Sequence, residues 1–263
     1  MMIYRTDYHI HSDYSDGKAK PEEYIDIAIK KGFNEIGFSE HLNIKYNDPE
    51  WCMDPLMVED YIKHINILRK SHSDIFIKTG LEVDFFPGYE KETAKFLNPF
   101  PLDYIIGSVH YMGSVTIDSG EDFYKEKNID KLFDDYFSLV YEAVSSELFD
   151  LIAHCDLIRI FGHNYSSNPE FFYQHLALLM AKHNTAFEIN TNGRNRPLGE
   201  FYPDVRFIHI FKEANVPACV NSDAHFPERV GQYFNEAYKI LKDAGYTEMC
   251  IFNKRQRQMI QIP

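Results

Sequence analysis

The chain has 263 residues, with 27 Lys and Arg against 40 Asp and Glu, so its formal net charge is −13. This length suits one large domain or two small ones, and a hydrophobic content of 44% excludes general disorder. The acidic balance argues against a protein that mainly wraps nucleic acid, because phosphates are neutralised by Lys and Arg. A small anionic substrate is not excluded, since its binding depends on local charge.

No stretch of the sequence approaches the roughly 18 to 20 consecutive apolar residues that cross a bilayer, so no membrane association is expected. The first residues are polar and charged and contain no apolar signal core, so secretion is not expected. The cysteines are far apart and form no CxxC pair: Cys52, Cys155, Cys219 and Cys250. This usage is typical of reduced thiols and predicts a cytoplasmic protein.

Short apolar runs alternate with longer helix-like stretches along the chain. The apolar runs predict strands at residues 3–10, 35–39, 75–83, 104–109, 151–153, 186–189 and 218–221. The longer stretches predict helices at residues 21–31, 55–69, 89–97, 130–148, 169–183, 203–214 and 230–244. A late run at residues 248–253 predicts an eighth, edge-like strand.

This alternation indicates an α/β protein with a parallel sheet. Seven strand–helix units in about 250 residues fit a closed, TIM-like barrel better than an open sheet. No linker, low-complexity tract or internal repeat divides the sequence. Residues 1–263 are therefore expected to form a single domain.

Histidine and acidic residues gather at the predicted carboxyl ends of these strands. Nine fall there or just beyond: His9, His11, Asp16, His41, Glu82, His110, His154, Asp223 and His225. The carboxyl ends of parallel barrel strands lie on one face, where active sites are built, so these residues would converge on one pocket. His9 and His11 are two positions apart on a strand and point the same way, while Ile10 points into the packing outside.

Imidazole nitrogens and carboxylate oxygens without a thiolate suit Zn, Mn or Fe. A single histidine is more often a satisfied polar residue than a ligand, but six at the ends of five strands differ from a chance scatter. The other six are interpreted as exposed or capping residues: His64, His72, His163, His175, His183 and His209. Glu40, Asp7 and Asp156 lie beside predicted ligands and would either orient an imidazole or be solvated.

The motifs His-x-His, YSDG, SEH, GLE, GSVH, AHCD and SDAH follow one another in this order. Together they resemble the polymerase and histidinol phosphatase (PHP) superfamily, in its stand-alone histidinol-phosphatase branch. The resemblance extends from DYHIHSDYSDG to the SDAH segment and beyond it to FNKR, and the segment EINTNGRNRPLGEFYP also resembles that branch. It implies a distorted (β/α)7 TIM-like barrel with three divalent metal ions at the C-terminal ends of the strands.

Carried over residue by residue, the resemblance implies three metal sites. The first ion would take His9, His11, Glu82 and Asp223. The second would take Glu82, His110 and His154, and the third would take Asp16, His41 and His225. Glu82 would bridge the first two ions, and Glu82, Asp223 and His225 are the predicted catalytic residues. Ser39 departs from the family pattern, in which a threonine is common at that position.

Divalent ions at these sites would attract a phosphate monoester, which carries nearly two negative charges. Two ions sharing Glu82 would clamp a phosphoryl group, and a water bridging them would lose its proton near neutral pH and attack phosphorus. Arginine suits bidentate phosphate binding. Arg159 matches the family position for this role, with an ion pair to Asp156 as its alternative, and Arg194 and Arg196 are further candidates.

The leading hypothesis is a metal-dependent phosphomonoesterase that hydrolyses L-histidinol phosphate to L-histidinol and phosphate in histidine biosynthesis. The alternatives are a phosphoesterase acting on a sugar phosphate or nucleotide, a nucleic-acid-processing module, and a non-catalytic metal-binding barrel. The loop at residues 41–55 is a candidate specificity lid, in which a carboxylate could meet the substrate's amino group. Its relevant residues are Tyr46, Asp48, Glu50 and Trp51. No nucleic-acid partner is expected.

Overall fold

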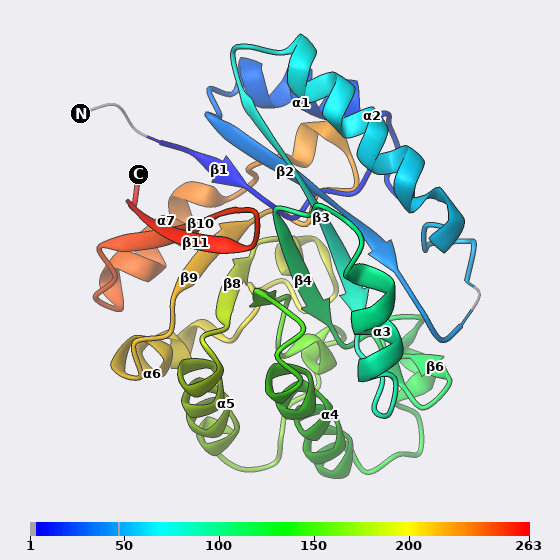
Figure 1. Ribbon diagram of the computed structural model, residues 1–263. Helices are drawn as coiled ribbons and strands as arrows, with labels where there is room; N and C mark the ends of the chain where they lie inside the picture. Colours follow the sequence, from blue (N-terminus) through cyan, green and yellow to red (C-terminus); the bar gives the residue numbers. More distant parts are fainter. Residues whose placement is uncertain (1–3, 47) are drawn as a thin grey trace.

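Seven parallel strands form one sheet that nearly closes into a barrel (Figure 1). The computed structural model describes residues 4–46 and 48–263. The strands are hydrogen-bonded in the order β1-β2-β3-β4-β7-β8-β9. They comprise β1 (Thr6–Asp7), β2 (Glu35–Leu42), β3 (Phe76–Asp84), β4 (Tyr104–Ser108), β7 (Leu151–Ile152), β8 (Ala186–Asn190) and β9 (Ala218–Asn221). A parallel bridge between Ile10 and Ala224 joins the two ends of the sheet, so the predicted (β/α)7 TIM-like barrel is confirmed.

Helices connect the strands and surround the barrel (Figure 1). They comprise α1 (Pro21–Lys30), α2 (Val58–Ser71), α3 (Glu90–Leu97), α4 (Ile129–Ser145), α5 (Glu170–His183), α6 (Ile208–Glu213) and α7 (Phe234–Asp243). Helices α2 and α6 begin later than predicted because a 3₁₀ turn precedes each, at Pro55–Met57 and Val205–Phe207. The Asp54 side chain caps the first of these turns by accepting from the backbone N–H of Leu56. Among the described residues, no helix has the length and apolar content needed to cross a membrane.

Two short antiparallel strand pairs lie outside the barrel sheet: β5 (Tyr111–Met112) with β6 (Val115–Thr116), and β10 (Glu248–Asn253) with β11 (Gln256–Gln261). The predicted eighth strand therefore exists, but it pairs within a separate hairpin rather than at the edge of the barrel. Cys250 and Phe252 of this hairpin pack against Tyr8 and Tyr104 inside the barrel. The hairpin thus closes the end of the barrel at which the strands begin.

The side chain of Tyr104 fills the barrel interior near the end at which the strands begin. Its hydroxyl donates to the carbonyls of Tyr8 (2.7 Å) and Phe38 (3.0 Å). A Cβ atom added at Gly37 or Gly80 would lie 2.3 Å from atoms of the Tyr104 side chain, so both positions need glycine for this close approach. Tyr104 therefore fills the space between these strands below the level of the histidine residues.

The first strand is much shorter than predicted. Its regular ladder covers only Thr6–Asp7, and Ile3, the first residue of the predicted strand, lies outside the described residues. Tyr8 packs inside the barrel, whereas Ile10 packs in the outer core, as the spacing predicted. The regular alternation is therefore interrupted after Tyr8, and His9 and His11 both approach the barrel centre.

Candidate metal centre

The nine predicted ligands converge at the carboxyl ends of the barrel strands. They form four groups in which one nitrogen or oxygen atom of each residue lies within 4.8 Å of those of the others. The groups are His9–Glu82–His154, His9–His11–Asp223, His41–Glu82–His110 and His11–Asp16–His41–His225. The structure therefore contains several buried groups able to bind metal ions, and these groups use all nine residues singled out from the sequence.

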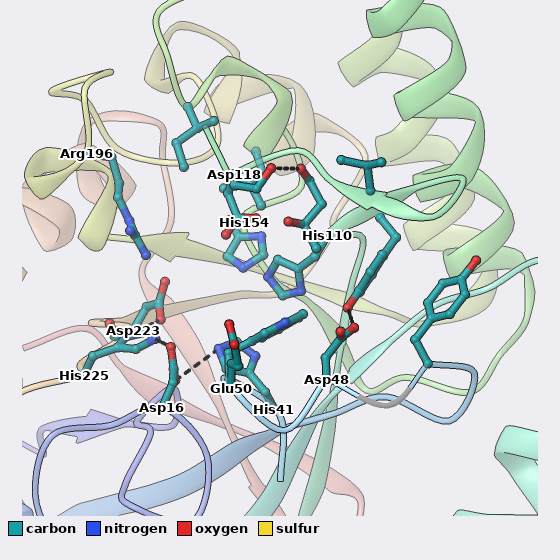
Figure 2. Close-up of a pocket in the computed structure, with 18 of the residues that line it drawn as sticks. Asp16, His41, Asp48, Glu50, His110, Asp118, His154, Arg196, Asp223 and His225 are labelled. Atoms are coloured by element: carbon teal, nitrogen blue, oxygen red, sulfur yellow. Dashed lines mark hydrogen bonds and ion pairs between the residues drawn. The ribbon is translucent and has the colours of Figure 1, made fainter. Parts of the chain in front are cut away.

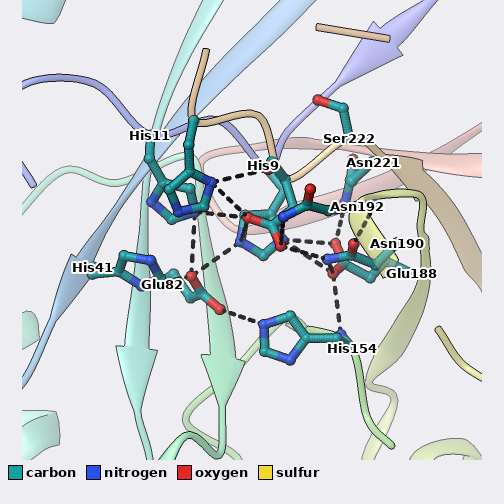
Figure 3. Close-up of polar contacts among 12 residues, drawn as sticks. His9, His11, His41, Glu82, His154, Glu188, Asn190, Asn192, Asn221 and Ser222 are labelled. Carbon is teal, nitrogen blue, oxygen red and sulfur yellow. Dashed lines mark hydrogen bonds and ion pairs between the residues drawn. The ribbon is translucent and has the colours of Figure 1, made fainter. Parts of the chain in front are cut away.

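Glu82 of β3 lies at the middle of this arrangement (Figure 3). The parallel register places it directly beside His41 of β2. Its Oε2 atom lies 2.8 Å from Nδ1 of His41, 3.0 Å from Nε2 of His9 and 3.4 Å from Nε2 of His11. Its Oε1 atom lies 3.1 Å from Nε2 of His154 and 3.7 Å from Nε2 of His110. One buried carboxylate thus contacts imidazoles from both sides of the barrel.

Asp223 forms a second acidic position just beyond β9. Its Oδ1 lies 3.4 Å from Nε2 of His11 and 3.4 Å from Nδ1 of His225. Burial raises the pKa of Asp223, but His9, His11 and His225 outweigh this effect and lower it well below its ordinary value. The backbone of Asp223 has a φ of 49°, in the left-handed region that aspartate tolerates better than most residues. Such a conformation is typical of functional sites.

The side chain of His11 provides the test of whether a cation fits here. It is fully buried, and neither of its ring nitrogens has a hydrogen-bond partner among the described residues. Burial, together with the neighbouring His41 and His225, lowers the pKa of His11 to about 3, so the ring is neutral and has a free lone pair. A buried polar atom without a partner is costly. A divalent cation beside Glu82 and Asp223 would satisfy it, so the donor set fits a metal.

Asp16 reaches the same centre from the loop after β1. Its Oδ2 lies 3.2 Å from Nε2 of His225, and its Oδ1 lies 3.7 Å from Nε2 of His41. The loop passes so close to His11 that a Cβ atom at Gly17 would lie 2.1 Å from the His11 carbonyl oxygen. Buried Glu40 fastens this loop, because its carboxylate accepts from the hydroxyls of Ser12 and Ser15.

Two other carboxylates orient the imidazoles, and sequence reasoning missed both. Asp84 accepts from Nδ1 of His110 at 2.9 Å. Burial opposes protonation of His110, but Asp84 and Glu82 raise its pKa to about 10. Glu188 contacts Nδ1 of His9 at 3.1 Å. The sequence offered a signal for each: Asp84 is two positions after Glu82 and shares its face, and Glu188 is on a barrel strand in EIN.

The three acidic residues considered from the sequence for this role have other partners. Glu40 faces the loop described above, and Asp7 accepts from the hydroxyl and backbone N–H of Ser222. Asp156 accepts from Arg159 and Tyr173. None of the three contacts the ring of a predicted ligand in the part of the chain that the structure describes.

A cavity of about 850 Å³ opens above the metal-binding groups (Figure 2). Asp16, His41, His110, His154, Asp223 and His225 line its base. Tyr46, Asp48, Glu50 and Trp51 line it from the loop after β2, and the role of this loop as a specificity lid stays a prediction. The Tyr111 hydroxyl donates to Asp48, which fastens this loop to β5. Aromatic and acidic side chains therefore line this side of the cavity.

The three predicted phosphate-binding arginines differ in position. Arg196 lines the cavity. Arg194 pairs instead with Glu236 at 2.7 Å. Arg159 is buried and does not line this cavity: it lies 3.0 Å from Asp156, 2.7 Å from Glu200 and 3.6 Å from Asp204. The ion pair with Asp156, the alternative stated for Arg159, is present. Its predicted role in phosphate binding stays a prediction.

Comparison with protein families agrees with this arrangement. The PHP domain model matches residues 7–192, and the PHP-associated model matches residues 208–241. The chain belongs to the PHP domain family. It is 35% identical over 245 residues to the probable histidinol-phosphatase of Deinococcus radiodurans, which covers 91% of this chain and 93% of that protein. The histidinol-phosphatase of Lactococcus lactis is 28% identical over 259 residues, covering 95% and 94%.

Solved structures show the same PHP fold. The crystal structure of the histidinol phosphate phosphatase of Lactococcus lactis, complexed with Zn, L-histidinol and phosphate, matches with a TM-score of 0.86 at 24% identity. The match covers 98% of this chain and 100% of that chain. Family membership and the four buried metal-binding groups together identify the chain as a PHP metal-dependent phosphoesterase.

Proposed function

We propose that this PHP protein is a histidinol-phosphatase, which hydrolyses L-histidinol phosphate to L-histidinol and phosphate in histidine biosynthesis. The observation that carries the proposal is the distribution of charge in the cavity above the metal-binding groups. A guanidinium, Arg196, lies on one side, and three carboxylates lie elsewhere on its wall: Asp48, Glu50 and Asp118 (Figure 2). A substrate with a phosphate at one end and an ammonium group at the other complements this arrangement. The likeness to histidinol-phosphatases along the whole chain supports the same substrate.

The buried groups would hold up to three divalent ions, with Zn, Mn or Fe suited to the nitrogen and oxygen donors. Glu82 takes part in two of the groups, and Asp223 and His225 line the cavity as well as joining the groups. These three residues are therefore the proposed catalytic residues. When bound, the ions supply Lewis acidity, which activates water and neutralises charge on the phosphoryl group.

The side chains around the cavity would orient the substrate. Arg196 presents a planar fork of N–H donors that matches two phosphate oxygens. The aromatic rings of Trp51 and Tyr111 are stacked at an interplanar angle of 28°, with centroids 5.9 Å apart, and form an apolar wall beside the acidic residues. An imidazole ring of the substrate would pack against this wall while its ammonium group meets a carboxylate. The reacting phosphate would then lie over the base of the cavity.

The acidic wall distinguishes this substrate from the alternatives. A sugar phosphate carries no cation to meet the three carboxylates, and a nucleic-acid backbone would place further negative charge against them. The test is the ratio of kcat/KM for L-histidinol phosphate to kcat/KM for the analogue that lacks its amino group. We expect the wild type to prefer L-histidinol phosphate. An exposed charge pair contributes up to about 1 kcal/mol, so the responsible carboxylate, changed to its amide, should lower this ratio roughly two- to fivefold.

Single variants identify that carboxylate: Asp48→Asn, Glu50→Gln and Asp118→Asn. Glu248→Gln, which removes a carboxylate from β10 away from the cavity, is the control. A wild-type ratio near one, with the same rate for sugar phosphates, would contradict the proposed substrate while leaving metal-dependent phosphoester hydrolysis intact.

A further inference from the structure

Strand β8 differs from its neighbours in what it offers to the metal centre. In the part of the chain that the structure describes, it supplies no member of the four metal-binding groups, whereas every other barrel strand supplies at least one residue at or just beyond its end. Instead it carries Glu188, whose side chain is fully buried and points toward His9 and His154 (Figure 3). An acidic side chain is almost never fully buried unless it is paired, so its contacts define its role.

Four donors surround the Glu188 carboxylate. Nδ1 of His9 lies 3.1 Å from both of its oxygens. The backbone N–H of His154 donates to Oε1 at 3.1 Å, as does the Asn190 amide at 2.8 Å. The Asn221 amide donates to Oε2 at 2.8 Å. These donors belong to strands or strand ends on β1, β7, β8 and β9, so one carboxylate connects four adjacent parts of the barrel.

The contact with His9 decides which of its nitrogens is free. A carboxylate only accepts hydrogen bonds, so the proton of His9 in its neutral form belongs on Nδ1. The lone pair then lies on Nε2, which is 3.0 Å from Oε2 of Glu82 and 3.7 Å from Oδ1 of Asp223. A lone pair directed at two carboxylate oxygens is unfavourable unless a cation lies between them. Glu188 therefore presents the correct nitrogen of His9 to the metal position.

We propose that Glu188 is a positioning residue for the metal centre. It fixes the tautomer and the orientation of the His9 ring. By accepting from the backbone N–H of His154, it also holds in place the main chain that carries this second metal-binding histidine. Two groups contain His9 and so depend on it, whereas no hydrogen bond among the described residues joins Glu188 to the His11–Asp16–His41–His225 group. The inference rests on the metal-binding part of the proposed function and not on the identity of the substrate.

The test compares Glu188→Gln with Glu35→Gln. Glu35 is also a buried barrel glutamate, but it lies at the opposite end, where its carboxylate accepts from the hydroxyls of Tyr4 and Tyr8. Each chain is stripped with a chelator and reloaded with Zn or Mn, and metal affinity is measured by chelator competition and ion content by elemental analysis. Glu188→Asp, which keeps the charge but shortens the side chain, is the second variant if Glu188→Gln does not fold.

Loss of a residue that orients a metal-binding histidine typically weakens metal binding by about 10- to 100-fold. We expect this loss in Glu188→Gln, with fewer ions retained per chain, a smaller loss in Glu188→Asp, and none in Glu35→Gln. The melting temperature of the stripped protein separates this effect from a general loss of stability, because metal affinity should fall even where that temperature is unchanged. Unaltered metal affinity in both Glu188 variants, or an equal loss in Glu35→Gln, would overturn the inference. Absence of metal from the reloaded wild type would overturn the proposed function as well.

Discussion

Replacing Glu82 by glutamine tests the centre of the metal-binding arrangement. The change keeps the volume of the side chain but removes a negative charge that contacts five imidazoles. One of the two oxygens also becomes an NH₂ donor, which cannot serve as a ligand. Glu82 belongs to two of the four groups, so both lose an anionic ligand at once.

The size of the effect follows from the number of groups. A contact with a charged partner contributes about 1.5–3 kcal/mol, so losing one in each of two groups removes roughly 3–6 kcal/mol. At about 1.4 kcal/mol per tenfold change, metal binding should weaken by about 10- to 100-fold at each of the two groups, or about 10²- to 10⁴-fold for the two together. Asp16→Asn is the matched comparison, because Asp16 belongs to one group and its side chain is 23% exposed. It should weaken metal binding by roughly tenfold to a hundredfold.

The assay loads both variants with metal, dialyses them against graded chelator and measures ion content together with phosphate release. Glu82→Gln should lose more ions per chain than Asp16→Asn, because two groups are weakened instead of one, and its kcat should be the lower of the two. A folded Glu82→Gln chain that keeps the wild-type ion content and most of its kcat would refute the central role of Glu82.

Three further changes test the cavity and the barrel. Arg196→Lys should lower kcat/KM for L-histidinol phosphate by about 10- to 100-fold without altering metal content, since it removes a bidentate contact; an unchanged kcat/KM would contradict its role. Arg159→Lys should lower the melting temperature, because Arg159 is buried among carboxylates; a fall in kcat/KM with unchanged stability would instead support the phosphate-binding role predicted from the sequence. Gly80→Ala should lower the free energy of unfolding by about 1–3 kcal/mol, since its Cβ would lie 2.3 Å from the Tyr104 ring. An unchanged melting temperature would contradict that packing.

The sequence was sufficient to predict the barrel and the convergence of the nine residues, because both follow from the order of the elements. Strand–helix alternation determines that the strand ends share a face, whatever the exact bounds of each element. The strand predicted at residues 248–253 is present, but its place in the fold was not predicted. An apolar run predicts a strand but not its partner, and only the fold reveals that Cys250 and Phe252 close the barrel.

The partners of the ligands were harder to predict. Glu40 is adjacent to His41 and Asp156 follows His154 by two positions, yet alternation or a turn directs both carboxylates away from the metal-binding groups. Glu188 is far in sequence from His9, and only the closure of the barrel brings them together. For the same reason, the sequence could propose three arginines for phosphate binding but could not show that Arg196 is the one that lines the cavity.

The proposed function is tested most directly by phosphate release from L-histidinol phosphate by the purified chain, measured beside a sugar phosphate and a nucleoside monophosphate. Each substrate is assayed with the chain as purified, after chelator treatment, and after Zn or Mn is restored. We expect L-histidinol phosphate to have the highest kcat/KM, chelation to abolish its hydrolysis, and restored metal to recover it. Hydrolysis that persists in the stripped chain, or no hydrolysis of L-histidinol phosphate by the fully loaded chain, would contradict the proposed function.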